Sequence, residues 1–313
     1  MIEFRHTPIM VEQVLSLLEP QRGGVFVDGT LGGGGHAQAV LSLLPTGAKL
    51  YGIDRDAAAI AAATERLKPF GMRFIPIRGN FHRMAELLRE QGETGADGIL
   101  LDLGVSSHQL DTPERGFSYH DDAPLDMRMD ASAPFSAYDV VNGYSADDLC
   151  RIIRDYGEER YASRVARAIV RVRETQGPIA GTVRLAEIVK SAIPAANRRE
   201  GPHPARRTFQ ALRIEVNGEL EGLEAAIESA HNLLRSGGRM AVITFHSLED
   251  RIVKQAFKRF ENPCTCDPRA PICTCGRRPT VRILTKKPIE AGEAELNENP
   301  RARSAKLRAI EKL

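Results

Sequence analysis

The sequence contains no tryptophan, and aromatic residues make up only 5% of its 313 residues. It has no apolar run approaching the roughly 20 residues of a membrane-spanning helix, which argues against such a helix, and we expect no membrane partner. A formal net charge of +2 is too small to indicate a polyanion-binding protein, so any nucleic-acid surface must be local. The first residues lack the basic-then-apolar order of a signal peptide, and we expect a cytoplasmic protein.

Cysteine is also scarce, and four of the five cysteines lie in one short segment, at Cys264, Cys266, Cys273 and Cys275. This distribution is not that of a secreted fold held together by disulfides. Four thiolates can bind zinc, but the C-x-C spacing is tighter than the usual zinc pattern. The sequence alone therefore favours a reduced structural loop, and we predict no metal site.

Apolar runs that predict strands alternate with helical patterns over the first hundred residues, which indicates a parallel sheet with right-handed crossovers. A long helical stretch, Thr208–Leu234, precedes a further apolar strand, and a strand at Thr280–Lys286 is predicted to close the sheet. The basic tail Arg301–Arg308 is predicted as a short helix. The predicted strands are Val25–Val27, Lys49–Ile53, Phe74–Ile77, Gly98–Leu103 and Met240–Phe245.

Between Asp111 and about Ala205 the pattern contains no strand candidate. Residues 115–130 are predicted to form an ordered loop. Helices are expected at Ala146–Asp155, Tyr161–Thr175 and Val183–Ala192. We therefore predict an α/β, Rossmann-like core formed by residues 1–110 and 206–313, and an inserted all-helical domain, residues 111–205, that recognises the substrate.

A glycine-rich turn, residues 28–36, joins the first predicted strand to a helix. Read from Gly32, it fits G-x-G-x-x-[GA], a pattern that also arises by chance. Asp54 ends the second strand about 20 residues further on, where a carboxylate is expected to bind ribose hydroxyls. A tight turn followed by an unrelated surface carboxylate is the alternative, but a ribose-bearing cofactor is favoured.

The acid at the end of the first strand, Asp28, bears on which cofactor binds. The pyrophosphate of a dinucleotide prefers bare amides at a helix N-terminus. S-adenosylmethionine instead carries a sulfonium and an ammonium group, which a carboxylate suits better. Asp28 thus favours S-adenosylmethionine without excluding a dinucleotide.

Ligands of open α/β sheets bind beyond the carboxyl ends of the strands. Those ends carry Asp28, Asp54, Phe81, Asp102 and His246. Phe81 is suited to stacking on adenine. Taken alone, it fits a place in the hydrophobic core equally well. Asp102 is placed to hold the cofactor, to orient an incoming amine, or both.

Six groups of motifs stand out between the first strand and the C-terminus: Gly34–His36, Asp102–Ser107 with Gln109–Asp111, Pro124–Asp130, Arg207–Arg213, Phe245–Arg251 and Asn299–Arg301. These motifs resemble the MraW (RsmH) family of S-adenosylmethionine-dependent methyltransferases, which modify N4 of a cytidine in 16S ribosomal RNA. The resemblance covers nearly the whole chain, although family members more often vary the residue at Gly33.

The resemblance implies a helical insert that helps to build the RNA site, with 16S rRNA in the small ribosomal subunit as partner. It also implies cofactor contacts at Gly34, Gly35, His36, Asp54, Phe81, Asp102 and Gln109. For the reaction, an acceptor beside N4 would hold one N–H and receive a proton. Asp102 is the first candidate for this catalytic role. His246 is the second, with a purely structural hydrogen bond as its alternative.

Reaching N4 requires an unpaired or extruded base. Phe117, Tyr119 and Phe135 are candidates for stacking on it. Four arginines share one face of a predicted helix and could bind RNA phosphates, or could serve solubility alone. They are Arg160, Arg164, Arg167 and Arg171.

Two other functions are compatible with this core, an NAD-dependent oxidoreductase and a non-catalytic ribosome-assembly factor. The sequence leaves open the oligomeric state, a homodimer included. It also leaves open whether the substrate is naked RNA or an assembled subunit.

Overall fold

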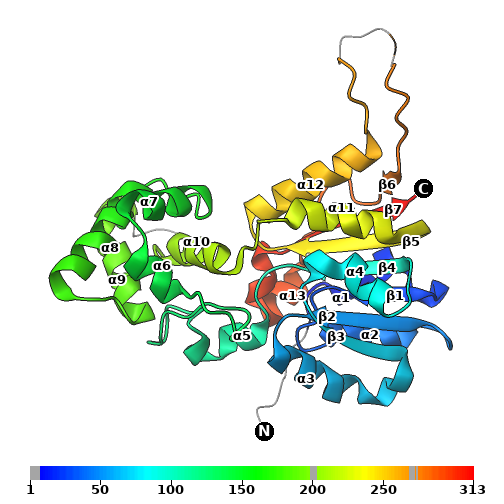
Figure 1. Cartoon of the computed structure of the whole chain (residues 1–313), viewed down its shortest axis with the longest axis horizontal. Helices are drawn as coiled ribbons and strands as arrows, with labels where there is room; N and C mark the ends of the chain where they lie inside the picture. The colour runs from blue at the N-terminus through cyan, green and yellow to red at the C-terminus, as the bar shows by residue number, and fades with distance from the viewer. Residues whose placement is uncertain (1–7, 198–202, 268–271, 273) are drawn as a thin grey trace. The chain divides into compact units, whose positions relative to one another are not determined.

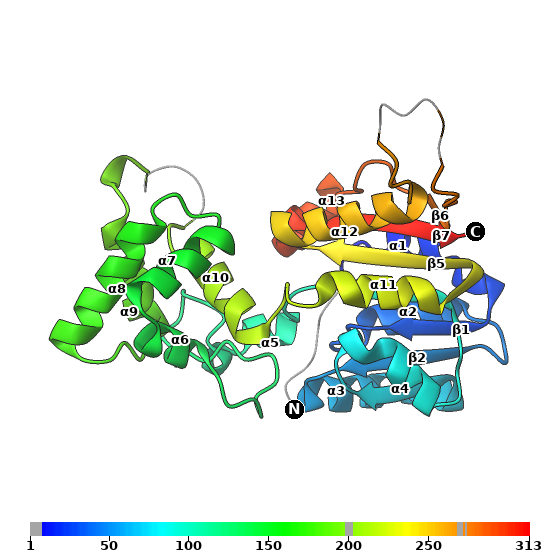
Figure 2. The ribbon, with the colours of Figure 1, turned by 45° about the horizontal axis from the view of Figure 1, so that its top comes forward.

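The computed structural model describes residues 8–197, 203–267, 272 and 274–313. The chain forms two compact units, each drawn in Figures 1 and 2. We call Met1–Gly104 with Glu221–Leu313 the sheet unit, and Val105–Leu220 the helical unit. None of the helices in the described ranges is long and apolar enough to cross a membrane.

The sheet unit contains a seven-stranded sheet in the order β3-β2-β1-β4-β5-β7-β6. The first five strands in this order are parallel, and β7 is antiparallel to both of its neighbours. The predicted Rossmann-like sheet is therefore confirmed. The strands are β1 (Val25–Asp28), β2 (Lys49–Asp54), β3 (Phe74–Arg78), β4 (Ala96–Asp102), β5 (Leu234–Thr244), β6 (Val281–Ile283) and β7 (Lys306–Lys312).

Helices of the sheet unit pack their apolar faces against these strands. Residues of α1, α2 and α3 share a core with Leu50, Leu100 and Ile243 of the sheet, while α11 contacts α4 and α12. The helices are α1 (Val11–Leu18), α2 (Gly35–Leu43), α3 (Ala57–Leu67), α4 (Met84–Glu90), α11 (Leu223–Leu233), α12 (Ser247–Glu261) and α13 (Glu293–Glu298).

The C-terminal tail corrects one prediction. The predicted short helix Arg301–Arg308 is a 3-10 helix over Pro300–Ser304, but its last residues, from Lys306 on, belong to β7, which lies between β5 and β6. The predicted strand Thr280–Lys286 is reduced to the edge strand β6. Leu307, Ala309 and Ile310 are buried in β7. Arg308, also buried, hydrogen-bonds through Nε to Asp250 Oδ1 at 2.7 Å. Because this ion pair neutralises the arginine, a basic segment can form an inner strand.

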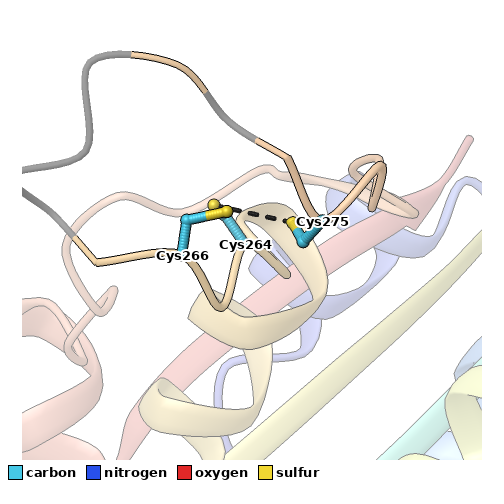
Figure 3. A group of neighbouring side chains, drawn as sticks. All are labelled: Cys264, Cys266 and Cys275. Carbon is cyan, nitrogen blue, oxygen red and sulfur yellow. Dashed lines mark hydrogen bonds between the residues drawn. The ribbon is translucent and has the colours of Figure 1, made fainter.

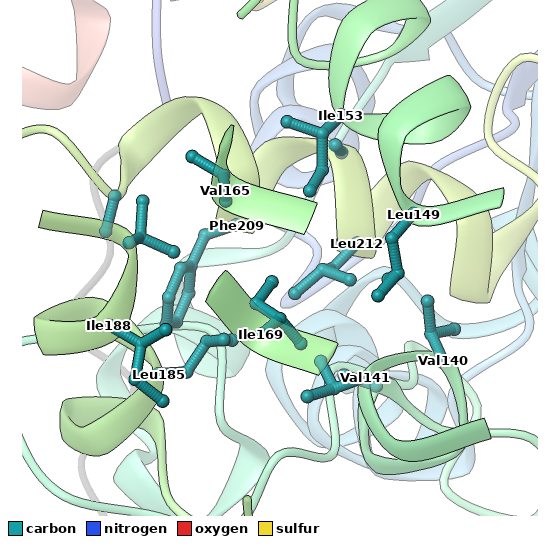
Figure 4. Packing of buried hydrophobic residues seen from close by; sticks show 14 of the residues in the cluster. Val140, Val141, Leu149, Ile153, Val165, Ile169, Leu185, Ile188, Phe209 and Leu212 are labelled. Atoms are coloured by element: carbon teal, nitrogen blue, oxygen red, sulfur yellow. The ribbon is translucent and has the colours of Figure 1, made fainter. Parts of the chain in front are cut away.

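The helical unit has its own hydrophobic core, part of which Figure 4 shows. The loop at 115–130 belongs to it, because Leu125, Met127 and Met129 are buried at alternate positions. The three helices expected within 146–192 are present, whereas α5 and α6 were not predicted. The helices are α5 (Ser107–Asp111), α6 (Ala137–Gly143), α7 (Ala146–Asp155), α8 (Ala162–Gln176), α9 (Thr182–Ala192) and α10 (Arg206–Asn217).

The predicted continuous helix Thr208–Leu234 is in fact two helices, α10 and α11. Gly218 and Gly222 separate them with φ angles of 59° and 73°, a left-handed backbone that glycine adopts without strain. Phe209 and Leu212 of α10 pack into the helical unit's core. The units accordingly divide after Gly104 and Leu220, rather than at the predicted limits of 110 and 205.

Candidate active site

The order of the strands reverses at β1, which lies between β2 and β4. Such a switch point is where open α/β sheets bind ligands, beyond the carboxyl ends of the strands. Three acids occupy these ends: Asp28 on β1, Asp54 on β2 and Asp102 on β4. The structure thus gathers three of the predicted site residues at one edge of the sheet.

Asp54 braces the glycine turn. Its Oδ2 accepts a hydrogen bond from the Gly32 N–H at 2.8 Å, and its Oδ1 accepts one from the Asp56 N–H at 2.9 Å. Thr30, in the same turn, accepts the Asp102 N–H through Oγ1 at 2.6 Å. Each oxygen of Asp54 can accept a further bond, so its predicted contact with ribose hydroxyls remains open to it.

Two of the acids are strongly perturbed. Asp28 is 3% exposed, and burial raises its pKa to about 7 despite the attraction of His36. Burial, followed by the nearby charge of Glu249, also raises the pKa of Asp102 to about 7. Asp102 Oδ1 is buried and accepts no hydrogen bond from the described residues. This edge is therefore rich in acceptors and poor in donors.

His36, in the first turn of α2, adds another acceptor. Its Nε2 lies 2.8 Å from the Ile9 carbonyl oxygen, which can only accept, so Nε2 carries the proton. Burial lowers the pKa of His36, which favours the neutral ring. Its Nδ1 then presents a lone pair to Asp102 Oδ2, 3.6 Å away. A donor group placed between them could bond to both atoms.

The glycines of the turn allow close packing. Gly34 has a φ of 76°, and a Cβ there would lie 3.1 Å from Ala63 Cβ on α3. A Cβ on Gly35 would lie 3.1 Å from Pro8. Packing thus explains both glycines, and the cofactor contacts that the resemblance implies for them stay predictions.

Phe81 follows β3 in a short 3-10 turn, Phe81–Arg83. A Cβ added to Gly29 would lie 3.2 Å from the Phe81 Cβ, so Phe81 adjoins the start of the glycine turn. Its ring meets the His82 ring edge-on, with 4.5 Å between the centroids. This position beside the turn agrees with an adenine-stacking role, which remains a prediction.

His246 caps α12. Its Nδ1 accepts the Glu249 N–H at 3.4 Å, and its Nε2 lies 3.2 Å from Glu249 Oε1. Glu249 in turn accepts the Phe245 N–H at 2.9 Å. The bond at Nδ1 supports the structural interpretation of His246. Its Nε2, however, is buried and has no hydrogen-bond partner among the described residues, so a role in proton transfer stays a prediction. Sequence reasoning missed Glu249, although its position three residues after His246 is that of a capping box.

Gln109 lies in the helical unit and is 5% exposed. Its Oε1 accepts the Ser106 N–H at 3.0 Å, and its Nε2 donates to the Met129 carbonyl at 3.3 Å. These bonds fix α5 to the loop that follows it. The implied cofactor contact of Gln109 therefore stays a prediction.

Of the three aromatic residues suggested for base stacking, Phe117 does not fit. It is 8% exposed and belongs to the core of the helical unit. Tyr119 stacks on His203 at 4.7 Å and meets Phe209 edge-on at 5.2 Å. Phe135 is 37% exposed, which leaves it as the best placed of the three.

The predicted arginine face divides into two parts. The Arg160 guanidinium lies 4.9 Å from the centroid of the Tyr161 ring. Arg164, Arg167 and Arg171 of α8 instead line a groove of about 550 Å³ whose other wall is the end of α9 and Pro194. Within the described ranges, no acidic side chain pairs with these three arginines. We call this feature the arginine groove.

Comparison with known proteins decides the family, because residues 3–313 match the MraW methylase family. The chain belongs to the MraW methylase family. It is 56% identical over 310 residues to a protein of Geobacter sulfurreducens named ribosomal RNA small subunit methyltransferase H, covering 99% of each chain. A protein of the same name from Symbiobacterium thermophilum is 53% identical over 310 residues, covering 99% of this chain and 97% of the relative.

The MraW membership confirms the resemblance seen in the sequence. It also confirms the Rossmann-like methyltransferase fold and S-adenosylmethionine as the cofactor. The roles predicted for individual residues depend on the geometry at the carboxyl ends of the parallel strands.

Proposed function

We propose that this MraW family member transfers a methyl group from S-adenosylmethionine to N4 of a cytidine in the decoding region of 16S rRNA, in the cytoplasm. The names of the relatives support ribosomal RNA of the small subunit as the substrate. The observation that carries the chemistry is the donor-poor cluster of Asp28, His36 and Asp102 at the switch point of the sheet.

This cluster fits the cationic groups of S-adenosylmethionine. An ammonium group can donate to both His36 Nδ1 and Asp102, and Asp54 and Phe81 are suited to the ribose and the adenine. A pyrophosphate would instead be repelled by the three strand-end carboxylates. The site therefore argues against the NAD-dependent alternative.

Asp102 is our candidate for the catalytic acceptor. When bound, S-adenosylmethionine supplies an electrophilic methyl group on its sulfonium. The N4 amine is a weak nucleophile because its lone pair is delocalised into the ring. Asp102 would accept one N–H of that amine, orient its lone pair and take up the proton. The Asp102 side chain is 25% exposed, so its carboxylate can meet the amine, whereas its Oδ1 is enclosed by the protein and has no hydrogen-bond partner among the described residues.

The arginine groove is our candidate for RNA contact outside the sheet edge. Guanidinium groups bind phosphates, and releasing counterions makes the affinity depend on salt, with a log–log slope of about 0.7 per phosphate for single strands. We expect Arg164→Ala with Arg167→Ala to weaken RNA binding and, with one phosphate per arginine, to reduce this slope by about 1.4. Arg154→Ala, which removes an exposed arginine paired with Asp155 on α7, should leave the slope unchanged. An unchanged slope in the double variant would remove the groove from the interface.

Mass mapping of methylated nucleosides tests the proposed reaction. Small subunits from cells lacking the protein should carry unmodified cytidine at one position of 16S rRNA, and purified protein with cofactor should restore N4-methylcytidine. Parallel reactions on naked RNA and on subunits identify the substrate form. Binding to subunits without methylation would instead support the assembly-factor alternative.

A further inference from the structure

The connection between α12 and β6 brings cysteine side chains together, outside the site described above. Its base is closed by a hydrogen bond from the Thr280 N–H to the Phe260 carbonyl at 2.9 Å. The two arms leave this base side by side (Figures 1 and 2). One arm carries Cys264 and Cys266, and the other carries Cys275, as Figure 3 shows. Cys273 lies outside the described residues.

The three sulfur atoms all lie within 4.8 Å of one another, and 3.8 Å separates Cys264 Sγ from Cys275 Sγ. A disulfide needs about 2.05 Å, so these two residues are not bonded. In a tetrahedral zinc site with bonds of about 2.3 Å, neighbouring sulfurs are about 3.8 Å apart. Without a metal ion, an S–H···S hydrogen bond joins this pair, and the same spacing fits two thiolates bound to one metal ion.

The surroundings of Cys266 agree with a thiolate. The Thr274 N–H, from the opposite arm, donates to Cys266 Sγ at 3.3 Å. Backbone donors of this kind stabilise the negative charge on metal-bound sulfur and orient the ligand. The cysteines are partly or fully exposed, so an ion can reach them from solvent.

We propose that Cys264, Cys266 and Cys275 bind a structural zinc ion that ties the two arms of this connection together. Zinc prefers thiolate ligands and four-coordinate geometry, so these three thiolates would leave one position for a further ligand such as water. On binding, each thiol loses its proton to solvent and its sulfur bonds to Zn²⁺, so the affinity should fall as the pH falls. This replaces the metal-free loop that the sequence favoured.

Elemental analysis of the untagged full chain, purified under reducing conditions without chelator, tests the proposal. We expect one zinc ion per chain, falling at least tenfold in Cys264→Ser and in Cys275→Ser. Cys150→Ser, which changes a thiol in α7 of the helical unit, is the matched control and should retain its zinc. Metal-free wild-type protein after incubation with Zn²⁺, or a zinc content unaffected by both substitutions, would overturn the proposal.

Cobalt substitution gives a second readout that does not depend on folding of the variants. Wild-type protein loaded with Co²⁺ should show an intense sulfur-to-cobalt charge-transfer band and the visible bands of a tetrahedral ion. Three or four coordinated thiolates support the site. The weak absorption of an octahedral ion with oxygen and nitrogen ligands, or a Cys264–Cys275 disulfide in the reduced preparation, would contradict it.

Discussion

Acidic side chains have opposite surroundings at the two ends of the parallel strands, which we call the two edges of the central sheet. At the edge where the parallel strands begin, Asp97 pairs with Arg235 at 2.6 Å and Glu311 pairs with Arg239 at 2.9 Å. At the edge where they end, Asp28 and Asp102 have pKa values raised to about 7, and no arginine or lysine among the described residues neutralises them.

This difference separates stability from function. A buried ion pair satisfies both partners, and removing one of them leaves an uncompensated charge. A buried carboxylate without a cation is unfavourable in the folded protein, and it persists where a ligand supplies the missing charge. The beginning of the sheet is therefore self-sufficient, whereas its end is complete only with a cationic ligand. Substitutions at the two edges should accordingly affect different measurements.

The largest effect is expected at the ligand-binding edge. Asp102→Asn keeps the shape of the side chain but cannot take up a proton, so we expect methyl transfer to fall about 10³-fold, or about 4 kcal/mol. The wild-type rate should rise with pH through about 7, because only the ionised Asp102 accepts a proton, and the variant should lose this dependence.

Calorimetry of S-adenosylmethionine binding separates the two roles suggested for Asp102. Unchanged affinity with lost turnover assigns Asp102 to the amine, and loss of both assigns it to the cofactor as well. Full activity of Asp102→Asn would exclude it from catalysis.

Substitutions at the opposite edge, where the parallel strands begin, should lower the stability of the protein and leave its turnover unchanged. The Arg239 side chain is 10% exposed and bonds to Glu311, to Glu19 and to the Leu17 carbonyl. Arg239→Met removes these three bonds, although Glu311 keeps Arg282 and Glu19 keeps Arg22. We expect the free energy of unfolding to fall by about 2 kcal/mol, because a carbonyl and two partly buried carboxylates each lose a donor. The rate per folded molecule should be unchanged.

Arg282 supplies the matched control for Arg239, because it pairs with the same Glu311 at 2.8 Å but its side chain is 62% exposed. Arg282→Ala should change the unfolding free energy by less than about 1 kcal/mol, as is usual for surface ion pairs. Equal losses from the two arginines, measured by urea denaturation, would show that burial is not what matters here.

Much of the fold could be predicted because strands buried on both faces appear as continuous apolar runs. The strand β7 could not, since Lys306, Arg308 and Glu311 interrupt its apolar residues. Arg308 is acceptable there only because of Asp250, a partner 58 residues away in the sequence. Local patterns carry no information about such a partner.

The candidate site shows the same limit. The acids at the strand ends could be found from the sequence, because the ends of parallel strands meet at one edge. The proton on His36 Nε2 depends on the Ile9 carbonyl, and the convergence of the cysteines depends on the Thr280–Phe260 closure. Both are contacts between distant residues, so spacing alone could not indicate them.

The last prediction concerns the stability of the ligand-free protein. The pKa of Asp28 is about 7 in the folded chain and 3.8 without burial, so between these pH values the folded state binds more protons than the unfolded state. The contribution of Asp28 to the stability of the fold is then greatest below about pH 4 and is lost as the pH rises to 7.

Asp28→Asn cannot ionise and still accepts the Thr30 N–H. We expect it to be more stable than wild type at pH 8, by at most about 4 kcal/mol, and similar to it at pH 4. Thermal unfolding at the two pH values, without cofactor, measures this difference. Destabilisation at pH 8 would mean that Asp28 is neutralised within the folded chain, and the contrast between the two edges would fail at β1.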